Sequence, residues 1–375
     1  MKLFLLAAVV AATMLPPVAE AITFSYTDDY ETFTVPTAGN YRFVVKGASG
    51  GGSVDNPFND DIVTYGGAGV TLTSILSLAA GEVFHIVVGS QGSYGSAYSG
   101  SGGGGGSFAV SASNMVIAGG GGGASIYLDG RDGQTGTSGG DGSRGGGVGG
   151  YGGNGGYIAG GGGGGGLYGA GFEGERYDDD AGGRTFYGGF GGDGGQDLRN
   201  AYSGALSNGD YFGLQGGSGT DHYYRYPGPP AGFIYFYGGP GGFGGGGGAS
   251  WFGGGGGGGG FSGGGGGAGA GSFAAGGGGG GSISTGTILS FSTNVGYGEV
   301  SIDLVSSVPE PSTWPMLLSG FGLIGFALRR IRRRTVSIDS GPPNHGVSTV
   351  QPRQADALAA LRIKKPTLDT QLSLL

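Results

Sequence analysis

The chain has 375 residues, of which 102 are Gly and none is Cys. Its formal net charge is −8, and only 12% of its residues are charged. The lack of Cys excludes disulfide scaffolds, thiolate metal sites and Cys nucleophiles. With 3 His, a His-based metal or acid–base centre is not expected. Glycine recurs in no sustained G-X-Y register, which argues against a collagen-like fibre.

Glycine and charge are both distributed unevenly along the chain. Residues 47–281 hold 93 of the 102 Gly. Residues 22–313 carry 22 Asp and Glu against 8 Lys and Arg, a net of −14, whereas the residues after them carry 3 acidic and 9 basic groups, a net of +6. This asymmetry indicates two different environments. The acidic body lacks the basic surface that nucleic acids require, so no nucleic-acid partner is expected.

The first 21 residues have the pattern of a secretory signal peptide. Lys2 precedes an apolar run at residues 3–15, and Ala19 and Ala21 are the small residues that a signal peptidase reads. We therefore predict that residues 1–21 are removed and that the mature chain starts at Ile22. The alternative is a buried N-terminal helix.

From residue 22 to residue 305 the chain alternates between short β-prone segments and glycine runs. Helical periodicity is nearly absent there, and alternating or β-branched segments predict strands. These strands are expected at residues 31–35, 39–47, 70–78, 83–88, 107–110, 115–118, 233–237, 287–292 and 299–305. The pattern predicts one all-β domain, most simply a sandwich, with a long Gly-rich insert.

Residues 30–305 resemble the glycine-rich domain in the ectodomain of anaplastic lymphoma kinase-type receptors. The resemblance rests on residues 33–36 before a strand, the glycines of residues 47–52 after it, and the closing strand at residues 298–302. It implies a jelly-roll-like β-sandwich with packed polyglycine helices inserted in it. Polyglycine forms extended helices with three residues per turn, and these pack closely because they have no Cβ. The alternative is a disordered Gly-rich linker.

Residues 306–334 combine three features in a fixed order. An extended motif comes first, then an apolar run at residues 315–328 that we predict to be a membrane helix, then an arginine cluster. The motif is Val308, Pro309, Glu310 and Pro311, and the cluster is Arg329, Arg330, Arg332, Arg333 and Arg334. Prolines on both sides of the glutamate keep the motif extended. The arginines keep their end of the helix in the cytoplasm, so that the exported body lies outside the inner membrane.

This three-part arrangement resembles the PEP-CTERM sorting signal of Gram-negative bacteria. The resemblance implies processing by an exosortase, an inner-membrane intermediate, and release to the cell surface or extracellular matrix of a bacterium that makes polysaccharide or biofilm. The alternative is a plain single-pass anchor. Members of that family usually stop soon after the arginines, but here residues 335–375 follow. They are expected to be a disordered tail or a read-through artefact.

Nothing in the body has the pattern of a catalytic or cofactor site. GxGxxG recurs but never between a strand and a helix, and the phosphate-binding Gly-Lys-Ser/Thr is absent. The three Asp at residues 178–180, with Glu173 and Glu175 nearby, form an acidic cluster, for which a solvated loop is the alternative to Ca²⁺ binding. We expect no metal and no cofactor.

Two functional hypotheses follow, neither of them enzymatic. The first is a structural or adhesive protein of the cell surface or polysaccharide matrix, with signal peptidase and exosortase as processing partners. The second is a receptor-like or carbohydrate-binding module anchored in the membrane. For the second, Tyr223, Tyr224 and Arg225 offer aromatic faces and a guanidinium that suit sugars. A surface loop without a ligand is the alternative for these three residues.

Overall fold

The computed structural model describes residues 21–27, 29–54, 62–96, 98–175, 217–219, 221–225, 233–250, 252–269, 274–307, 320–326 and 329. By its contacts the chain divides into two units, Met1–Glu310 and Pro311–Leu375. In the second unit, residues 320–326 are helical and exposed.

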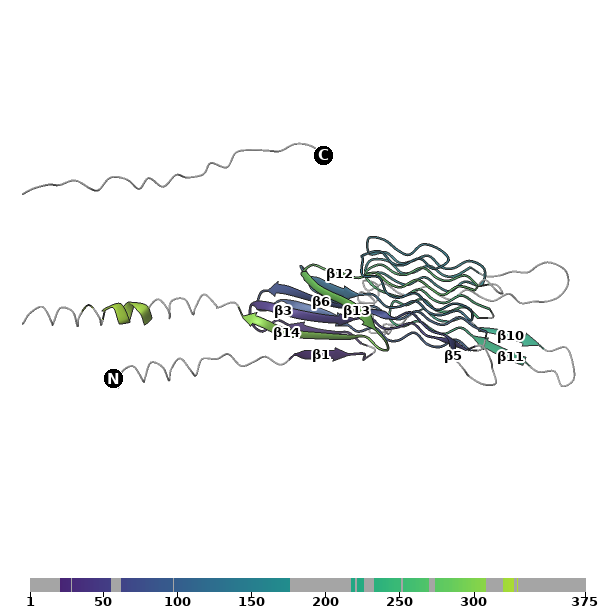
Figure 1. Cartoon of the computed structure of the whole chain (residues 1–375), viewed down its shortest axis with the longest axis horizontal. Helices are drawn as coiled ribbons and strands as arrows, with labels where there is room; N and C mark the ends of the chain where they lie inside the picture. Colours follow the sequence, from purple (N-terminus) through teal and green to yellow (C-terminus); the bar gives the residue numbers. More distant parts are fainter. Residues whose placement is uncertain are drawn as a thin grey trace, which may run out of the picture. The chain divides into compact units, whose positions relative to one another are not determined.

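The first unit contains two antiparallel five-stranded sheets (Figure 1). One sheet has the order β1-β14-β3-β6-β13, with bounds Ile22–Ser25, Glu299–Ser307, Gly39–Lys46, Gly69–Leu78 and Thr287–Asn294. The other has the order β12-β9-β8-β7-β2, with bounds Ile283–Ser284, Met115–Ala118, Ser107–Val110, Val83–Val87 and Glu31–Thr34. The described residues also form two small hairpins, β4 (Ser53–Val54) with β5 (Ile62–Thr64) and β10 (Asp221–Arg225) with β11 (Phe233–Tyr237).

The two sheets pack face to face over one apolar core. In β3 the burial alternates, with Tyr41, Phe43 and Val45 buried and Arg42 exposed, as a strand with one face on the core requires. The ring of Phe43 lies 5.1 Å, centroid to centroid, from the ring of Phe84 on β7 in the opposite sheet. The predicted all-β class with two sheets is therefore confirmed.

The order of the strands differs between the two sheets. Taken in chain order, β3, β6, β13 and β14 lie in the spatial order 4-1-2-3, which is Greek-key order. In the second sheet, β7, β8, β9 and β12 follow one another as a meander. A jelly roll combines two Greek keys. The first sheet thus has a Greek-key order and the second does not, and the jelly-roll-like arrangement stays a prediction.

Each segment that the sequence predicted to be a strand contains one, but five further strands were not expected. These are β1, β4, β5, β10 and β12. Two of them, β4 and β12, have two residues each, which is too short for any alternation to show. For residues 223–225 the sequence offers a surface loop as the alternative to a sugar contact, whereas β10 is a strand paired along its whole length with β11.

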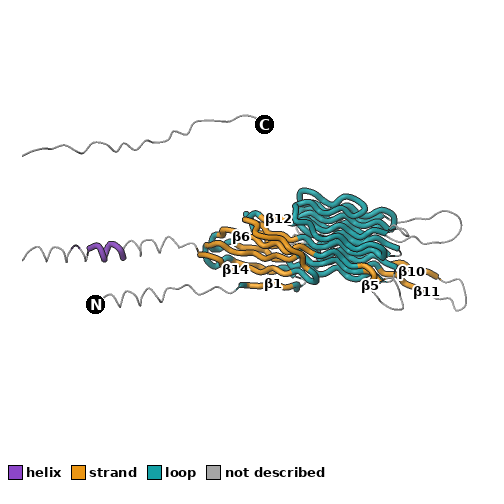
Figure 2. The backbone as a smooth tube through the Cα atoms, viewed as in Figure 1, coloured by secondary structure: helices purple, strands orange, loops and turns teal. Residues whose placement is uncertain are grey.

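The glycine-rich segments leave one end of the sandwich and stack side by side (Figure 2). We call residues 47–52, 65–69, 89–96, 98–106, 119–175, 238–250, 252–269 and 274–281 the glycine block. It contains almost no regular strand or helix, yet its amides and carbonyls pair from segment to segment. These described segments are not a linker, because hydrogen bonds fix each of them against its neighbours.

Hydrogen bonds in the glycine block repeat every three residues. Along residues 254–260, every third amide donates to the same neighbouring segment, and the three sets of amides reach three different segments. The donor–acceptor pairs are Gly254–Ala159, Gly257–Gly162 and Gly260–Gly165; Gly255–Ala275 and Gly258–Gly278; and Gly256–Ser101 and Gly259–Gly104. Three residues per turn is the period of a polyproline II helix. It is also the period expected of packed polyglycine helices.

Most positions in this block require glycine because there is no room for a side chain, and not because the backbone needs a left-handed φ. Among the described glycines, a left-handed φ occurs only at turns and bends, namely at Gly81, Gly149, Gly150, Gly244 and Gly296. Elsewhere a side chain is excluded because a neighbouring segment of the same chain lies too close. A Cβ on Gly103 would lie within 3.0 Å of the carbonyl group of Gly257, closer than real Cβ contacts come. Any side chain there would push two hydrogen-bonded segments apart.

How often glycine occurs in a segment depends on how many sides of that segment are covered by neighbouring segments. Residues 160–166 and 253–260 are entirely Gly and entirely buried. In residues 151–157, pairs of Gly separate Tyr151, Asn154 and Tyr157, all of which are exposed. In residues 130–145, Gly recurs at every third position between mostly exposed residues. This G-X-Y register is short, and it lies at the exposed edge of the block.

Candidate functional site

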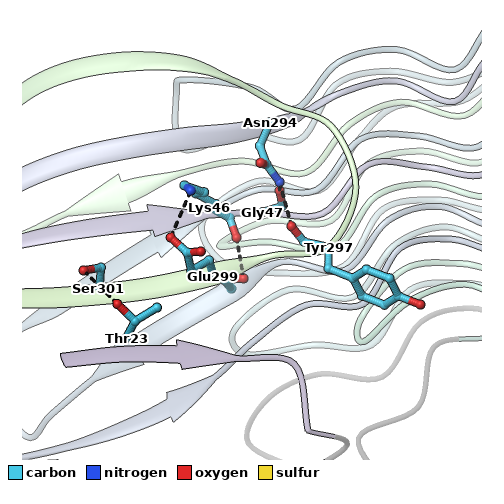
Figure 3. Close-up of polar contacts among 8 residues, drawn as sticks. Thr23, Lys46, Gly47, Asn294, Tyr297, Glu299 and Ser301 are labelled. Atoms are coloured by element: carbon cyan, nitrogen blue, oxygen red, sulfur yellow. Dashed lines mark hydrogen bonds and ion pairs between the residues drawn. The ribbon is translucent and has the colours of Figure 1, made fainter. Parts of the chain in front are cut away.

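Polar side chains gather where the sandwich meets the glycine block (Figure 3). Asn294, the last residue of β13, donates from Nδ2 to the carbonyl oxygens of Gly47 at 2.8 Å and Tyr297 at 2.9 Å. Beside it, Lys46 Nζ and Glu299 Oε1, on the paired strands β3 and β14, are 2.9 Å apart. The Asn294 amide therefore ties the end of β13 to the first glycine of the block, whereas the Lys46–Glu299 ion pair joins two strands of the sandwich.

Ser107 strengthens the same junction from the second sheet. Its Oγ donates to the carbonyl oxygen of Lys46 at 2.6 Å and accepts from the amide of Gly89 at 3.0 Å. The Ser107 residue is fully buried, and its bond with the Gly89 amide is shielded from water. One hydroxyl thereby joins the end of β3 to the first glycine after β7.

On the surface of the block, the side chain of Arg144 contacts side chains from two adjoining segments. The Arg144 guanidinium lies 3.7 Å from the centre of the Tyr157 ring and forms an ion pair with Glu175. Burial lowers the pKa of Arg144, but the hydrogen bond to Glu175 and its negative charge outweigh burial and raise the pKa above its usual value. Arg144 is therefore held as a structural cation.

The predicted processing sites lie mostly outside the described residues. Ala21 is exposed and immediately precedes β1, which starts at Ile22, the residue expected to begin the mature chain. Ala19 lies outside the described residues. So do the motif residues Val308, Pro309, Glu310 and Pro311 and four of the cluster, Arg330, Arg332, Arg333 and Arg334. Arg329 is helical and exposed.

The predicted sugar contact lies on a hairpin. Tyr223, Tyr224 and Arg225 belong to β10, where Tyr223 stands opposite Tyr235 of β11. The glycan contact remains a prediction.

The acidic cluster is only partly within the described residues. Glu175 pairs with Arg144 and Glu173 is exposed, whereas the Asp at residues 178–180 lie outside. Among the residues that the structure describes, no three His, Asp or Glu side chains come close enough to hold a metal ion.

Comparison with known families identifies the C-terminal segment. The family model of the PEP-CTERM protein-sorting motif matches residues 307–334, where the sequence predicted such a signal at residues 306–334. No curated protein matches the chain. The motif marks an exported protein that an exosortase processes, with a transient membrane stage and a cell-surface or extracellular destination.

Other expectations about the ends and the body are not tested by this match. The resemblance of residues 30–305 to the receptor glycine-rich domain stays a prediction, as does a Gram-negative host. Within the described ranges, no helix is long and apolar enough to cross a membrane. The membrane helix expected at residues 315–328 lies partly outside those ranges, and its described stretch, residues 320–326, is helical.

Proposed function

We propose that this protein is a non-enzymatic structural or adhesive component of the cell surface or of an extracellular polysaccharide matrix. The observation that supports it is the combination of the sorting motif at residues 307–334 with a body whose largest part is an interlocked glycine block. Signal peptidase and exosortase are the processing partners, and the inner membrane of a Gram-negative host is the intermediate location.

The physical properties of the block suit an external scaffold. It has no Cys, so its cohesion does not depend on the redox state of its surroundings. Its interior segments carry no side chains that oxidation or a change of pH would alter, and backbone hydrogen bonds hold them together. The polar groups described above are engaged with structural partners: Asn294 and Ser107 with the backbone of residues 46 and 47, and Arg144 with Glu175.

Fractionation of cells with and without an active exosortase tests the export pathway. With the enzyme, the protein should appear in the surface or matrix fraction, and its mass should correspond to a start at Ile22 and an end near Pro311. A Pro309→Ala, Pro311→Ala double variant should stay full-length in the inner membrane. The matched control, Pro342→Ala with Pro343→Ala in the tail, should be processed normally. Equal processing of both variants would refute the pathway.

The structural or adhesive role needs its own test. Deleting the gene should reduce matrix cohesion or surface attachment, and the wild-type gene should restore it. If export is normal but deletion changes neither property, the role is wrong while the sorting assignment stands.

A glycan-binding module is the second candidate, favoured by the β10–β11 register that sets Tyr223 opposite Tyr235. Purified protein would be applied to an array of bacterial polysaccharides. Binding that Tyr223→Ala and Tyr224→Ala abolish would support a sugar contact on this hairpin. Absence of binding to any glycan would count against this candidate.

A further inference from the structure

The strand β13 forms one edge of the first sheet and is paired on one side only among the described residues. Its neighbour is β6, to which Thr287–Asn294 is registered over nearly its whole length. Every residue from Thr287 to Thr293 is exposed, unlike the alternating burial of β3 and β6. Edge strands of this kind present unpaired amides and carbonyls to any extended chain that meets them.

The composition of β13 does nothing to discourage such pairing. Thr287–Asn294 contains no charged residue and no Pro, the two features that commonly protect an edge. Three apolar side chains are exposed on it, Ile288 by 43%, Leu289 by 54% and Phe291 by 38%. A register irregularity lies between Ile288 and Ser290, but the pairing from Ser290 to Asn294 is regular.

The other edges of the two sheets are less suited to pairing. β1 and β2 have four residues each, and β12 has two. Short edge strands offer few hydrogen bonds to a partner. β13, with eight residues, is therefore the edge from which a sheet would be extended.

We propose that β13 is a self-association surface through which a second copy of this chain pairs antiparallel, joining two five-stranded sheets into one of ten. A two-fold axis makes such a contact self-complementary. With the axis near Ser292, in the regularly paired part of β13, Phe291 of each copy lies opposite Thr293 of the other, an aromatic–β-branched pair of the kind that stabilises antiparallel strands. Because β13 is uncharged, no like charges meet across the axis.

Cysteine cross-linking tests this surface cleanly because the natural chain has no Cys. Ser292→Cys, on exposed β13, and Thr23→Cys, on exposed β1, each place one thiol in the full chain, purified in detergent. A short bismaleimide should convert Ser292→Cys to a covalent dimer and leave Thr23→Cys monomeric. Equal cross-linking of both variants would show that chance encounters in the micelle cause it, and failure of Ser292→Cys to cross-link would overturn the proposal.

A charge on the edge gives a second, independent readout. In sedimentation experiments Leu289→Lys should raise the dimer dissociation constant at least about tenfold, whereas Thr23→Lys should leave it unchanged. The thermal midpoint of dilute Leu289→Lys should match that of the wild type, which separates lost pairing from misfolding. A wild type that stays monomeric would refute the dimer without affecting the proposed export, which depends on residues 307–334.

Discussion

Asn294 and Gly47 are 247 positions apart in the chain, yet Nδ2 of Asn294 donates to the carbonyl oxygen of Gly47 at 2.8 Å. The same amide group holds the carbonyl of Tyr297 in the turn before β14. Gly47 is the first glycine after β3 and the first residue of the glycine block. The contact therefore ties the connection between β13 and β14 to the start of the block.

Replacing Asn294 with Ala should lower the free energy of unfolding by about 1–3 kcal/mol, because two backbone acceptors lose their donor. Urea denaturation followed by circular dichroism measures the loss. The control is Asn40→Ala, whose Nδ2 donates to Ser306 Oγ at an exposed position. It should cost about 1 kcal/mol or less. Equal losses for the two variants would argue against a special role for the junction.

Gly103→Ala should destabilise the glycine block strongly. A Cβ there would meet the backbone of Gly257 at a distance that forces the segments apart, and overpacking of this kind costs about 1–3 kcal/mol or more. Hydrogen exchange should show reduced protection at Gly256 and Gly259, whose amides bond to the same segment.

Gly136→Ala is the matched control for that experiment. A Cβ at Gly136 would have no atom within 4 Å, and its φ is not left-handed. Its substitution should be neutral or stabilising by about 0.4–1 kcal/mol, because Ala restricts the unfolded chain. If Gly103→Ala were equally harmless, close packing would not be the reason for glycine in the block.

The Phe43–Phe84 contact should be energetically coupled. The two rings come from opposite sheets and are fully buried. A double-mutant cycle with Phe43→Leu and Phe84→Leu should give a coupling free energy of about 0.5–1.5 kcal/mol. A cycle on Phe43 and the distant Phe243, in a separate cluster, should show almost none.

Glu82 should make stability depend on acid pH. Burial raises the pKa of its carboxyl, but hydrogen bonds from Asn114, Ser111 and Ser113 outweigh burial and hold the pKa below its ordinary value of 4.5. The carboxylate is thus stabilised by folding. This contribution is present above pH 4.5 and is lost as the pH falls below it through the lower folded pKa.

The comparison with Glu82→Gln isolates this effect. At neutral pH the variant should melt at a lower temperature than the wild type, and the difference should shrink as the pH falls below 4.5. A difference that stays constant over that range would show that the carboxyl does not titrate with folding.

Local patterns in the sequence were enough for most of the sandwich and for the C-terminal sorting signal. Alternation along residues 39–47 and 70–78 predicts strands with one buried face, and both β3 and β6 have it. The order of motif, apolar run and arginines predicted the sorting signal that the family model matches. These features depend on residue types at short spacing, which a single sequence displays directly.

Only the tertiary structure decided which glycine segments are neighbours. The amides of residues 254–260 bond to segments near residues 101, 159 and 275, but no side chain marks those partners. Backbone groups are identical at every glycine, so sequence alone cannot distinguish one pairing from another. The segments meet through contacts between distant parts of the chain, such as Asn294 to Gly47, and such contacts exist only once the chain has folded.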